Sequence, residues 1–437
     1  MIMVKRSLRG GGGGAGGVGG GLRFAATSLA LAVAAAAAPT AAVRADAAGG
    51  ADSADRTIAY RLQQRFPQAG LGPGRVGQVL DAASGRTVWS SGAQVGRMPA
   101  STAKLATAVT ALTVLGPGNT ERTRVVYADG TVYLVGGGDQ GLDRAGLTRL
   151  AGDAAQALTS RGLALHDLRV DDSLFPAPSP APGWQPGYYP YELAPVRALA
   201  LRGDRVDDTA VTAGGVFAHG LAAAGFAVPP GPVRRAVAPA VGGGVQLLAS
   251  RASAPLWNTV EYMLKVSDNN IAEGLLRLSA LAKGLPATWQ GGTATVRQVL
   301  DGYRVPMGGV ALFDGSGLSR QDRMTAAALS GLAALAVDPD PARHRMLWPL
   351  LQGLPIAGRD GTLAARLHRF DTAPSSCAAG LVHAKTGTLH DSTALAGVAR
   401  GSDGRWKAFA FVENGPVGKK QARKGLDGLA ATVAGCW

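Results

Sequence analysis

Residues suited to metal binding and redox chemistry are scarce in this sequence. The 437 residues include 2 cysteines and 6 histidines, and the histidines are dispersed, with no HExxH motif and no His/Cys cluster. Zinc and iron sites need such side chains at short, regular spacing. We therefore expect no metal ion. Neither cysteine has the sequence neighbours of a catalytic thiol.

Aromatic and acidic residues are also few. Aromatic side chains make up 5% of the chain, and 30 acidic residues stand against 44 lysines and arginines, which gives a formal net charge of +14. The basic residues are scattered, with no basic helix and no aromatic platform, so the pattern argues against nucleic-acid binding. A basic surface suits an anionic cell envelope. Long apolar runs are lacking after residue 47, which argues against a membrane helix.

The first 47 residues predict an export signal. Basic residues between 5 and 23 precede an apolar stretch at 24–38, which is too short to span a bilayer comfortably, and small residues at 43–47 form a cleavage site. The mature protein is therefore expected outside the cytoplasm, in a periplasm-like space, in the cell wall or secreted. An even number of cysteines in an exported chain permits a disulfide, which we predict between Cys377 and Cys436.

The remaining chain, about 390 residues, predicts strands near both ends and helices between them. Alternating apolar residues predict a hairpin at 76–90, and a helix opens at Pro99 and ends at the "GPGN" of 116–119. Two further strands are joined by a turn at 401–404, and a final helix covers 419–433. This order predicts one α+β domain whose sheet is closed by the two ends of the chain.

A change in the pattern of predicted strands and helices indicates a second, smaller unit inserted into this domain. From about residue 121 to 245 short strands and helices alternate around a proline-rich connector, "FPAPSPAPGWQPGYYP". We expect residues 48–120 and 246–437 to form the main domain and residues 121–245 to form the insert.

One motif in this insert imitates a dinucleotide-binding loop. A predicted strand leads into "VGGGDQGL", where Gly136, Gly138 and Gly141 have the GxGxxG spacing that brings backbone close to a pyrophosphate. The alternative function is thus an exported oxidoreductase. Against it, no further strand–helix alternation completes a doubly wound sheet, and Asp139 would place a carboxylate beside the pyrophosphate. A plain glycine-rich turn is the better interpretation.

A lone charge marks the candidate nucleophile. Between Met98 and Thr120 the chain is apolar or small and has one formal charge, Lys104, three residues after Ser101. Residues three apart share one face of a helix, so the two side chains can meet. A lysine becomes a base for a serine hydroxyl only if desolvation or a nearby cation lowers its pKa. A lysine on this apolar helix is placed for desolvation.

Two later motifs supply partners for such chemistry. "SDNN" interrupts a helical pattern at 254–284, where Ser267 can relay a proton and Asn269 can hold a carbonyl. Further on, "KTGT" begins at Lys385 and supplies a cation, hydroxyls and a glycine that permits close approach along a strand.

SxxK, SxN and KTG in this order are the motifs of penicillin-binding proteins and serine β-lactamases. The chain resembles the D-alanyl-D-alanine carboxypeptidase/endopeptidase family of low-molecular-mass class C penicillin-binding proteins. The resemblance covers most of residues 77–411, including "DGTVYLVGGGDQGL", "FDGSGLSRQDRMTAAAL" and "HAKTGTLHDSTALAG". It implies a penicillin-binding/serine β-lactamase-like transpeptidase domain, an antiparallel sheet flanked by helices, with a smaller inserted domain.

The resemblance also implies a role for each motif residue. Ser101 would be the acylated nucleophile and Lys104 its general base. Ser267 would pass the proton to the leaving amine, Asn269 would bind the substrate amide carbonyl, and Lys385 would support the relay and the electrostatics of the pocket.

The KTGT segment would bind the end of the substrate. Thr386, Gly387 and Thr388 would line its terminal carboxylate, and the backbone N–H groups of Ser101 and Thr388 would form an oxyanion hole. The implied reaction releases D-alanine from peptidoglycan stem peptides ending in D-Ala-D-Ala, through an acyl-enzyme and without a cofactor. Penicillin and other β-lactams are expected to acylate the same serine.

Other functions stay open at this stage. A serine β-lactamase shares the three motifs but has a shorter interval between the first two and no "GGGDQGL" insert. A non-catalytic wall-binding protein of the same fold would be expected to have lost a motif residue, and none is lost. Ser316 in "FDGSGLS" lacks the GxSxG elbow and is interpreted as part of a tight turn bordering the site.

Overall fold

The computed structural model describes residues 40–436, with side chains from residue 53 onward. Contacts divide the chain into Met1–Ala47 and Ala48–Trp437, and the fold described below is that of the second unit. The predicted export signal lies outside the described residues except for 40–47, where helix α1 (Thr40–Arg65) begins. None of the helices in the described part of the chain is long and apolar enough to cross a membrane.

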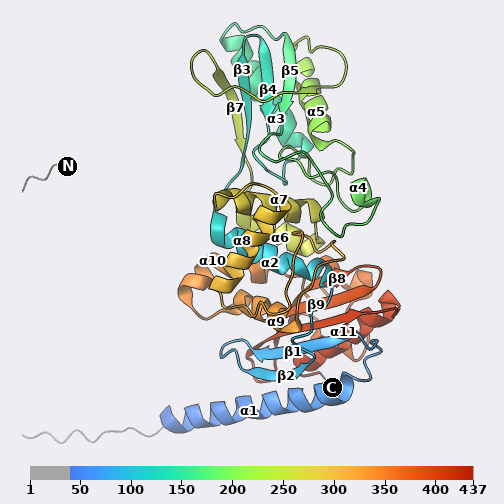
Figure 1. The fold of residues 1–437 in the computed structure, drawn as a ribbon. Helices are drawn as coiled ribbons and strands as arrows, with labels where there is room; N and C mark the ends of the chain where they lie inside the picture. The colour runs from blue at the N-terminus through green and yellow to red at the C-terminus, as the bar shows by residue number, and fades with distance from the viewer. Residues whose placement is uncertain (1–39, 437) are drawn as a thin grey trace, which may run out of the picture. The chain divides into compact units, whose positions relative to one another are not determined.

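A five-stranded antiparallel sheet combines both ends of this unit (Figure 1). Its strand order is β2–β1–β10–β9–β8. The bounds are β1 (Val76–Asp81), β2 (Thr87–Ser91), β8 (Val382–Thr388), β9 (Ser392–Arg400) and β10 (Trp406–Asn414). Strand β1 pairs with β10 over its whole length, Val76 opposite Val412. The predicted hairpin and the closure of the sheet by segments from both ends are thus confirmed.

The two faces of this sheet are packed differently because side chains alternate along a strand. Phe409 and Phe411 point to the face covered by α1 and by α11 (Lys419–Val433). The bounds of α11 agree with the final helix predicted at 419–433. On the opposite face Ala396, Ala410 and their neighbours contact the helical layer. Small side chains on that face let the helices approach the strands closely.

Six helices form the layer on the alanine-rich face. They are α2 (Lys104–Leu115), α6 (Leu256–Val266), α7 (Asn269–Ala282), α8 (Trp289–Gly302), α9 (Ala326–Ala334) and α10 (Pro341–Gly353). Helix α2 is buried from Lys104 to Leu112, which explains why its sequence is apolar all round. It is the central helix of the main hydrophobic core.

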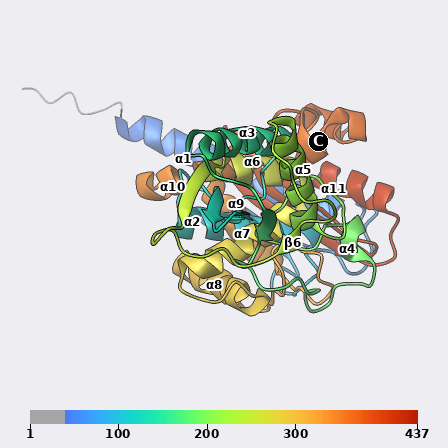
Figure 2. The same cartoon turned by 90° about the horizontal axis from the view of Figure 1, so that it is seen from above.

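A second sheet has its own core and a mixed topology. Its order is β6–β5–β4–β3–β7, with β4 and β5 parallel. Helices α3 and α5 lie side by side against it (Figures 1 and 2). The bounds are β3 (Arg122–Ala128), β4 (Thr131–Val135), α3 (Arg144–Ser160), β5 (Asp167–Asp171), α5 (Thr209–Ala223), β6 (Arg234–Arg235) and β7 (Gln246–Ala252).

The borders of this sheet differ in two details from the insert expected at 121–245. Strand β7 begins after residue 245 and pairs with β3, so the sheet extends to Ala252. The connector between β5 and α5 includes the single turn α4 (Tyr188–Tyr191). Phe175, Trp184 and Val196 of this connector pack in the core of the main domain. Part of the inserted sequence is therefore built into the main domain.

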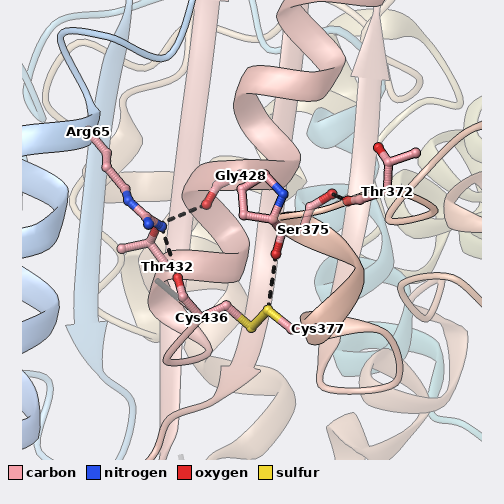
Figure 3. The surroundings of a disulfide bond; sticks show 8 residues. Arg65, Thr372, Ser375, Cys377, Gly428, Thr432 and Cys436 are labelled. Atoms are coloured by element: carbon pink, nitrogen blue, oxygen red, sulfur yellow. Dashed lines mark hydrogen bonds between the residues drawn. A yellow bond between two sulfur atoms is a disulfide. The ribbon is translucent and has the colours of Figure 1, made fainter.

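A disulfide joins Cys377 and Cys436, as predicted (Figure 3). Cys377 lies in the short 3₁₀ turn Ser375–Ala378 and Cys436 just beyond α11. On the other side of α11, Arg65 Nη1 donates hydrogen bonds of 2.9 Å to Thr432 Oγ1 and to the Cys436 carbonyl. The end of α11 is thus fixed both to the segment leading into β8 and to α1.

Candidate active site

The nucleophile candidate lies in a 3₁₀ turn and not in the α-helix itself. Residues Ala100–Ala103 form this turn and α2 follows directly at Lys104. In a 3₁₀ turn side chains three residues apart are eclipsed, which suits the SxxK spacing better than an α-helix does. Lys104 Nζ lies 2.9 Å from Ser101 Oγ.

Lys104 is fully buried and has three oxygen partners. Besides Ser101 Oγ, its Nζ donates to Asn269 Oδ1 at 2.7 Å and to the Ser316 carbonyl at 2.8 Å. Burial lowers the pKa of Lys104 to about 8, while the negative charges of Glu273 and Asp314 oppose this shift. A lowered pKa of Lys104 is what its position on an apolar helix predicted.

The SxN residues lie where α6 ends and α7 begins. Ser267 caps α6 with a left-handed backbone, φ 64°, and Asp268 caps α7 by accepting a hydrogen bond from Ile271 N. This geometry orients Ser267 Oγ toward Lys385 Nζ, 2.9 Å away. Asn269 Nδ2 donates one hydrogen bond, of 2.9 Å, to the Glu192 carbonyl.

The KTG residues lie on the edge strand β8. Lys385 is fully buried, and its pKa is lowered well below the ordinary value by burial and by the nearby charge of Lys104. A Cβ on Gly387 would lie 2.6 Å from the Pro99 carbonyl, so only glycine lets β8 lie this close to the turn of Ser101. Thr386 Oγ1 is 2.8 Å from Thr362 Oγ1.

The three motifs open into one cleft of about 660 Å³. Ser101, Ser267, Asn269 and Thr388 line it. Its other walls, most of which the sequence does not reveal, are formed by Gln185, Tyr188, Glu192, Leu318, Arg320, Leu389, His390 and Lys419. A larger cavity of about 790 Å³ between α1 and α11 contains none of the motif residues.

Two further features border the cleft. Arg320 forms an ion pair with Asp391, which follows the KTGT segment. Ser316 lies in a tight turn bordering the site, as expected, and contributes its carbonyl; its hydroxyl is buried without a hydrogen-bond partner. Within residues 40–436 no group of three or more His, Cys, Asp or Glu side chains is arranged to hold a metal ion.

The space beside two of the three GxGxxG glycines is occupied by other atoms of the chain. A Cβ on Gly136 would lie 2.6 Å from the Ala198 carbonyl, and one on Gly138 would lie 2.7 Å from Leu278 Cδ2. Asp139 accepts a hydrogen bond from Gly141 N within the same loop. Gly136 thus packs against the connector between β5 and α5 and Gly138 against α7, which argues against a pyrophosphate at this loop.

Fold and site together define a class: serine enzymes with the penicillin-binding and β-lactamase fold. Comparison with known proteins identifies the family within this class. A profile described as the D-Ala-D-Ala carboxypeptidase 3 (S13) family matches residues 58–206 and 202–434. Carboxypeptidase DacB of Mycolicibacterium smegmatis is 35% identical over 391 residues, which cover 85% of this chain and 82% of the relative. The chain therefore belongs to the D-Ala-D-Ala carboxypeptidase 3 (S13) family.

Solved structures give the same fold. Penicillin binding protein 4 of Haemophilus influenzae superposes with a TM-score of 0.71 at 21% identity, over 86% of this chain and 99% of that one. The same protein complexed with a β-lactam gives 0.64 at 23% identity, over 83% and 97%. The predicted family, the predicted fold class and the prediction of a serine-type D-Ala-D-Ala carboxypeptidase are confirmed.

Proposed function

We propose that this enzyme removes the C-terminal D-alanine from peptidoglycan stem peptides through an ester on Ser101, and that β-lactams acylate the same oxygen. The observation that carries this assignment is the contact of 2.9 Å between Ser101 Oγ and the buried Lys104 Nζ. Burial lowers the pKa of Lys104 to about 8, so a useful fraction of this amine is neutral near neutral pH.

The partners of Lys104 orient its lone pair. Asn269 Oδ1 and the Ser316 carbonyl can only accept hydrogen bonds, so they occupy both hydrogens of the neutral amine. The lone pair then faces the Ser101 hydroxyl. As Oγ attacks the penultimate D-alanine carbonyl carbon, its proton moves to Nζ. The oxyanion is stabilised by the backbone N–H groups of Ser101 and Thr388.

Collapse of this intermediate needs a proton on the leaving amine. Ser267 passes to the D-alanine nitrogen the proton that Lys104 took from Ser101, so Lys104 is neutral again, and Lys385 Nζ, 2.9 Å from Ser267 Oγ, supports this relay. The C–N bond breaks, D-alanine leaves, and a water molecule hydrolyses the ester. Burial and the nearby charge of Lys104 lower the pKa of Lys385 well below its ordinary value, as is common for ionisable groups at catalytic sites.

The remaining motif residues bind the substrate. Thr386 and Thr388 hold the terminal carboxylate beside Gly387. Asn269 Nδ2 has two hydrogens, of which one is donated to the Glu192 carbonyl, so the other is available for the substrate amide carbonyl. The relative solved with a β-lactam supports the proposal that β-lactams occupy this cleft. The proposed chemistry takes place outside the cytoplasm, where disulfides such as Cys377–Cys436 persist.

Covalent labelling tests the assignment of Ser101. Intact-mass measurement after incubation with penicillin should show one bound penicillin on the wild-type protein, localised by digestion to the peptide that contains Ser101. Ser101→Ala should remain unlabelled, whereas Ser279→Ala, which removes a buried hydroxyl elsewhere, should be labelled like the wild type. Release of D-alanine from a D-Ala-D-Ala peptide should follow the same pattern. Rapid penicillin hydrolysis without D-alanine release would favour a β-lactamase.

A further inference from the structure

A buried carboxylate lies directly behind the catalytic lysine. Glu273 is on α7, one turn beyond Asn269, and is fully buried. Both of its oxygens accept backbone hydrogen bonds of 2.8 Å, Oε2 from Gly315 N and Oε1 from Ser316 N. Because a protonated carboxyl would have to donate its own hydrogen, this double acceptance fits a carboxylate.

The segment that Glu273 fixes is the one that contacts Lys104. Thr107 Oγ1 donates a hydrogen bond of 2.6 Å to the Gly315 carbonyl, so α2 and α7 hold the segment from two sides. Close packing leaves it little freedom, since a Cβ on Gly317 would lie 1.9 Å from the Ala100 carbonyl. The Ser316 carbonyl is thereby placed 2.8 Å from Lys104 Nζ.

We propose that Glu273 is a positioning residue of the acylation step. It fixes the turn at 314–317 so that the Ser316 carbonyl holds one hydrogen of Lys104 and the lone pair faces Ser101. The inference rests on the proposed role of Lys104 as the base. When the Ser101 O–H bond breaks and the third N–H bond of Lys104 forms, the carboxylate also stabilises the new ammonium.

Burial and the neighbouring charges act on this pair in opposite directions. Burial, and next Asp314, raise the pKa of Glu273 to about 8, while the two backbone donors and Arg277 oppose that shift. The negative charge of Glu273 raises the pKa of Lys104 more than those of Asp314, Asp268 and Glu192 do. Lys385 approaches the same lysine from β8. Loss of the Glu273 charge should therefore lower the pKa of Lys104.

Three variants separate positioning from a merely structural role. Acylation by a fluorescent penicillin is followed from about pH 6 to about pH 9.5. Glu273→Gln should lower the apparent pKa by about one unit, and its high-pH plateau should fall by about tenfold or more because the base is poorly oriented. Glu273→Asp keeps the charge but is too short, so its plateau should fall with a smaller change in apparent pKa. Ser279→Ala, on the same helix, should match the wild type.

The outcomes are distinguishable from failure of the proposed function. If the wild-type protein is not acylated at Ser101, the proposed function is wrong. If the wild type is acylated and folded Glu273→Gln shows the same plateau and the same apparent pKa as the wild type, only this inference is overturned. Thermal unfolding verifies folding of each variant. Should Glu273→Gln not fold, Thr107→Val loosens the same segment from α2 and should lower the plateau without moving the apparent pKa. An unchanged plateau in that variant would equally overturn the inference.

Discussion

Replacing Lys104 by arginine should abolish acylation because arginine cannot be deprotonated in this site. The structure gives the magnitude. A lysine with an ordinary pKa of 10.5 is almost entirely charged at pH 7, whereas burial lowers the pKa of Lys104 to about 8. The neutral fraction at pH 7 therefore rises roughly 300-fold, to about a tenth. General-base catalysis contributes about 10²- to 10⁴-fold, and Lys104→Arg should lose that factor.

The assay is the rate of penicillin acylation as a function of pH. In the wild type the rate should rise about tenfold per unit below pH 7 and level off above the apparent pKa, since only the neutral amine accepts the Ser101 proton. Lys104→Met is the companion variant, because it fits the buried space without a charge and should be equally inactive. If folded Lys104→Arg is acylated as fast as the wild type, Lys104 is not the base and the reasoning fails.

Three further predictions concern other parts of the chain. Thiol labelling of the denatured, oxidised protein should find no free thiol, and loss of the Cys377–Cys436 bond should cost about 2–4 kcal/mol of stability in chemical unfolding. Asp139→Ala, in the inserted region, should leave turnover of a D-Ala-D-Ala peptide within about tenfold of the wild type, and a far larger loss in folded protein would give that region a chemical role. Gly387→Ala should push β8 away from the Pro99 carbonyl and reduce acylation severely, even in protein that thermal unfolding shows to be folded; wild-type acylation would contradict this.

The proposed reactive residues are visible in the sequence because their spacing is local. Ser101 and Lys104 are fixed by one turn of backbone, and the polar interruption at Ser267 is visible in an otherwise helical pattern. The spacing does not distinguish a 3₁₀ turn from an α-helical one, since both bring residues three apart together. In the structure this turn packs closely against Gly317, which is far away in sequence, and the spacing carries no sign of that contact.

The walls of the cleft could not be predicted in this way. Tyr188 and Glu192 come from a proline-rich connector without periodicity, and such a segment carries no signal for the surface on which it packs. Glu273 left a weak signal: it lies four residues after Asn269 and therefore on the same face of α7. A buried carboxylate on an apolar helix face needs partners, and those partners are backbone groups that no sequence pattern reveals.

The pairing of β1 with β10 makes the sheet behind the site depend on both ends of the second unit. Asn414, at the end of β10, donates to the Met98 carbonyl and accepts from Met98 N at 2.7 Å, across 316 positions of sequence. Closing so long a loop costs conformational entropy, and such non-local contacts slow folding. A nascent or truncated chain that ends before β8 has the SxxK and SxN segments but neither Lys385 nor the sheet that aligns them. Such a chain is expected to be inert toward peptides and antibiotics alike, so hydrolytic activity is withheld until the polypeptide has been made almost in full.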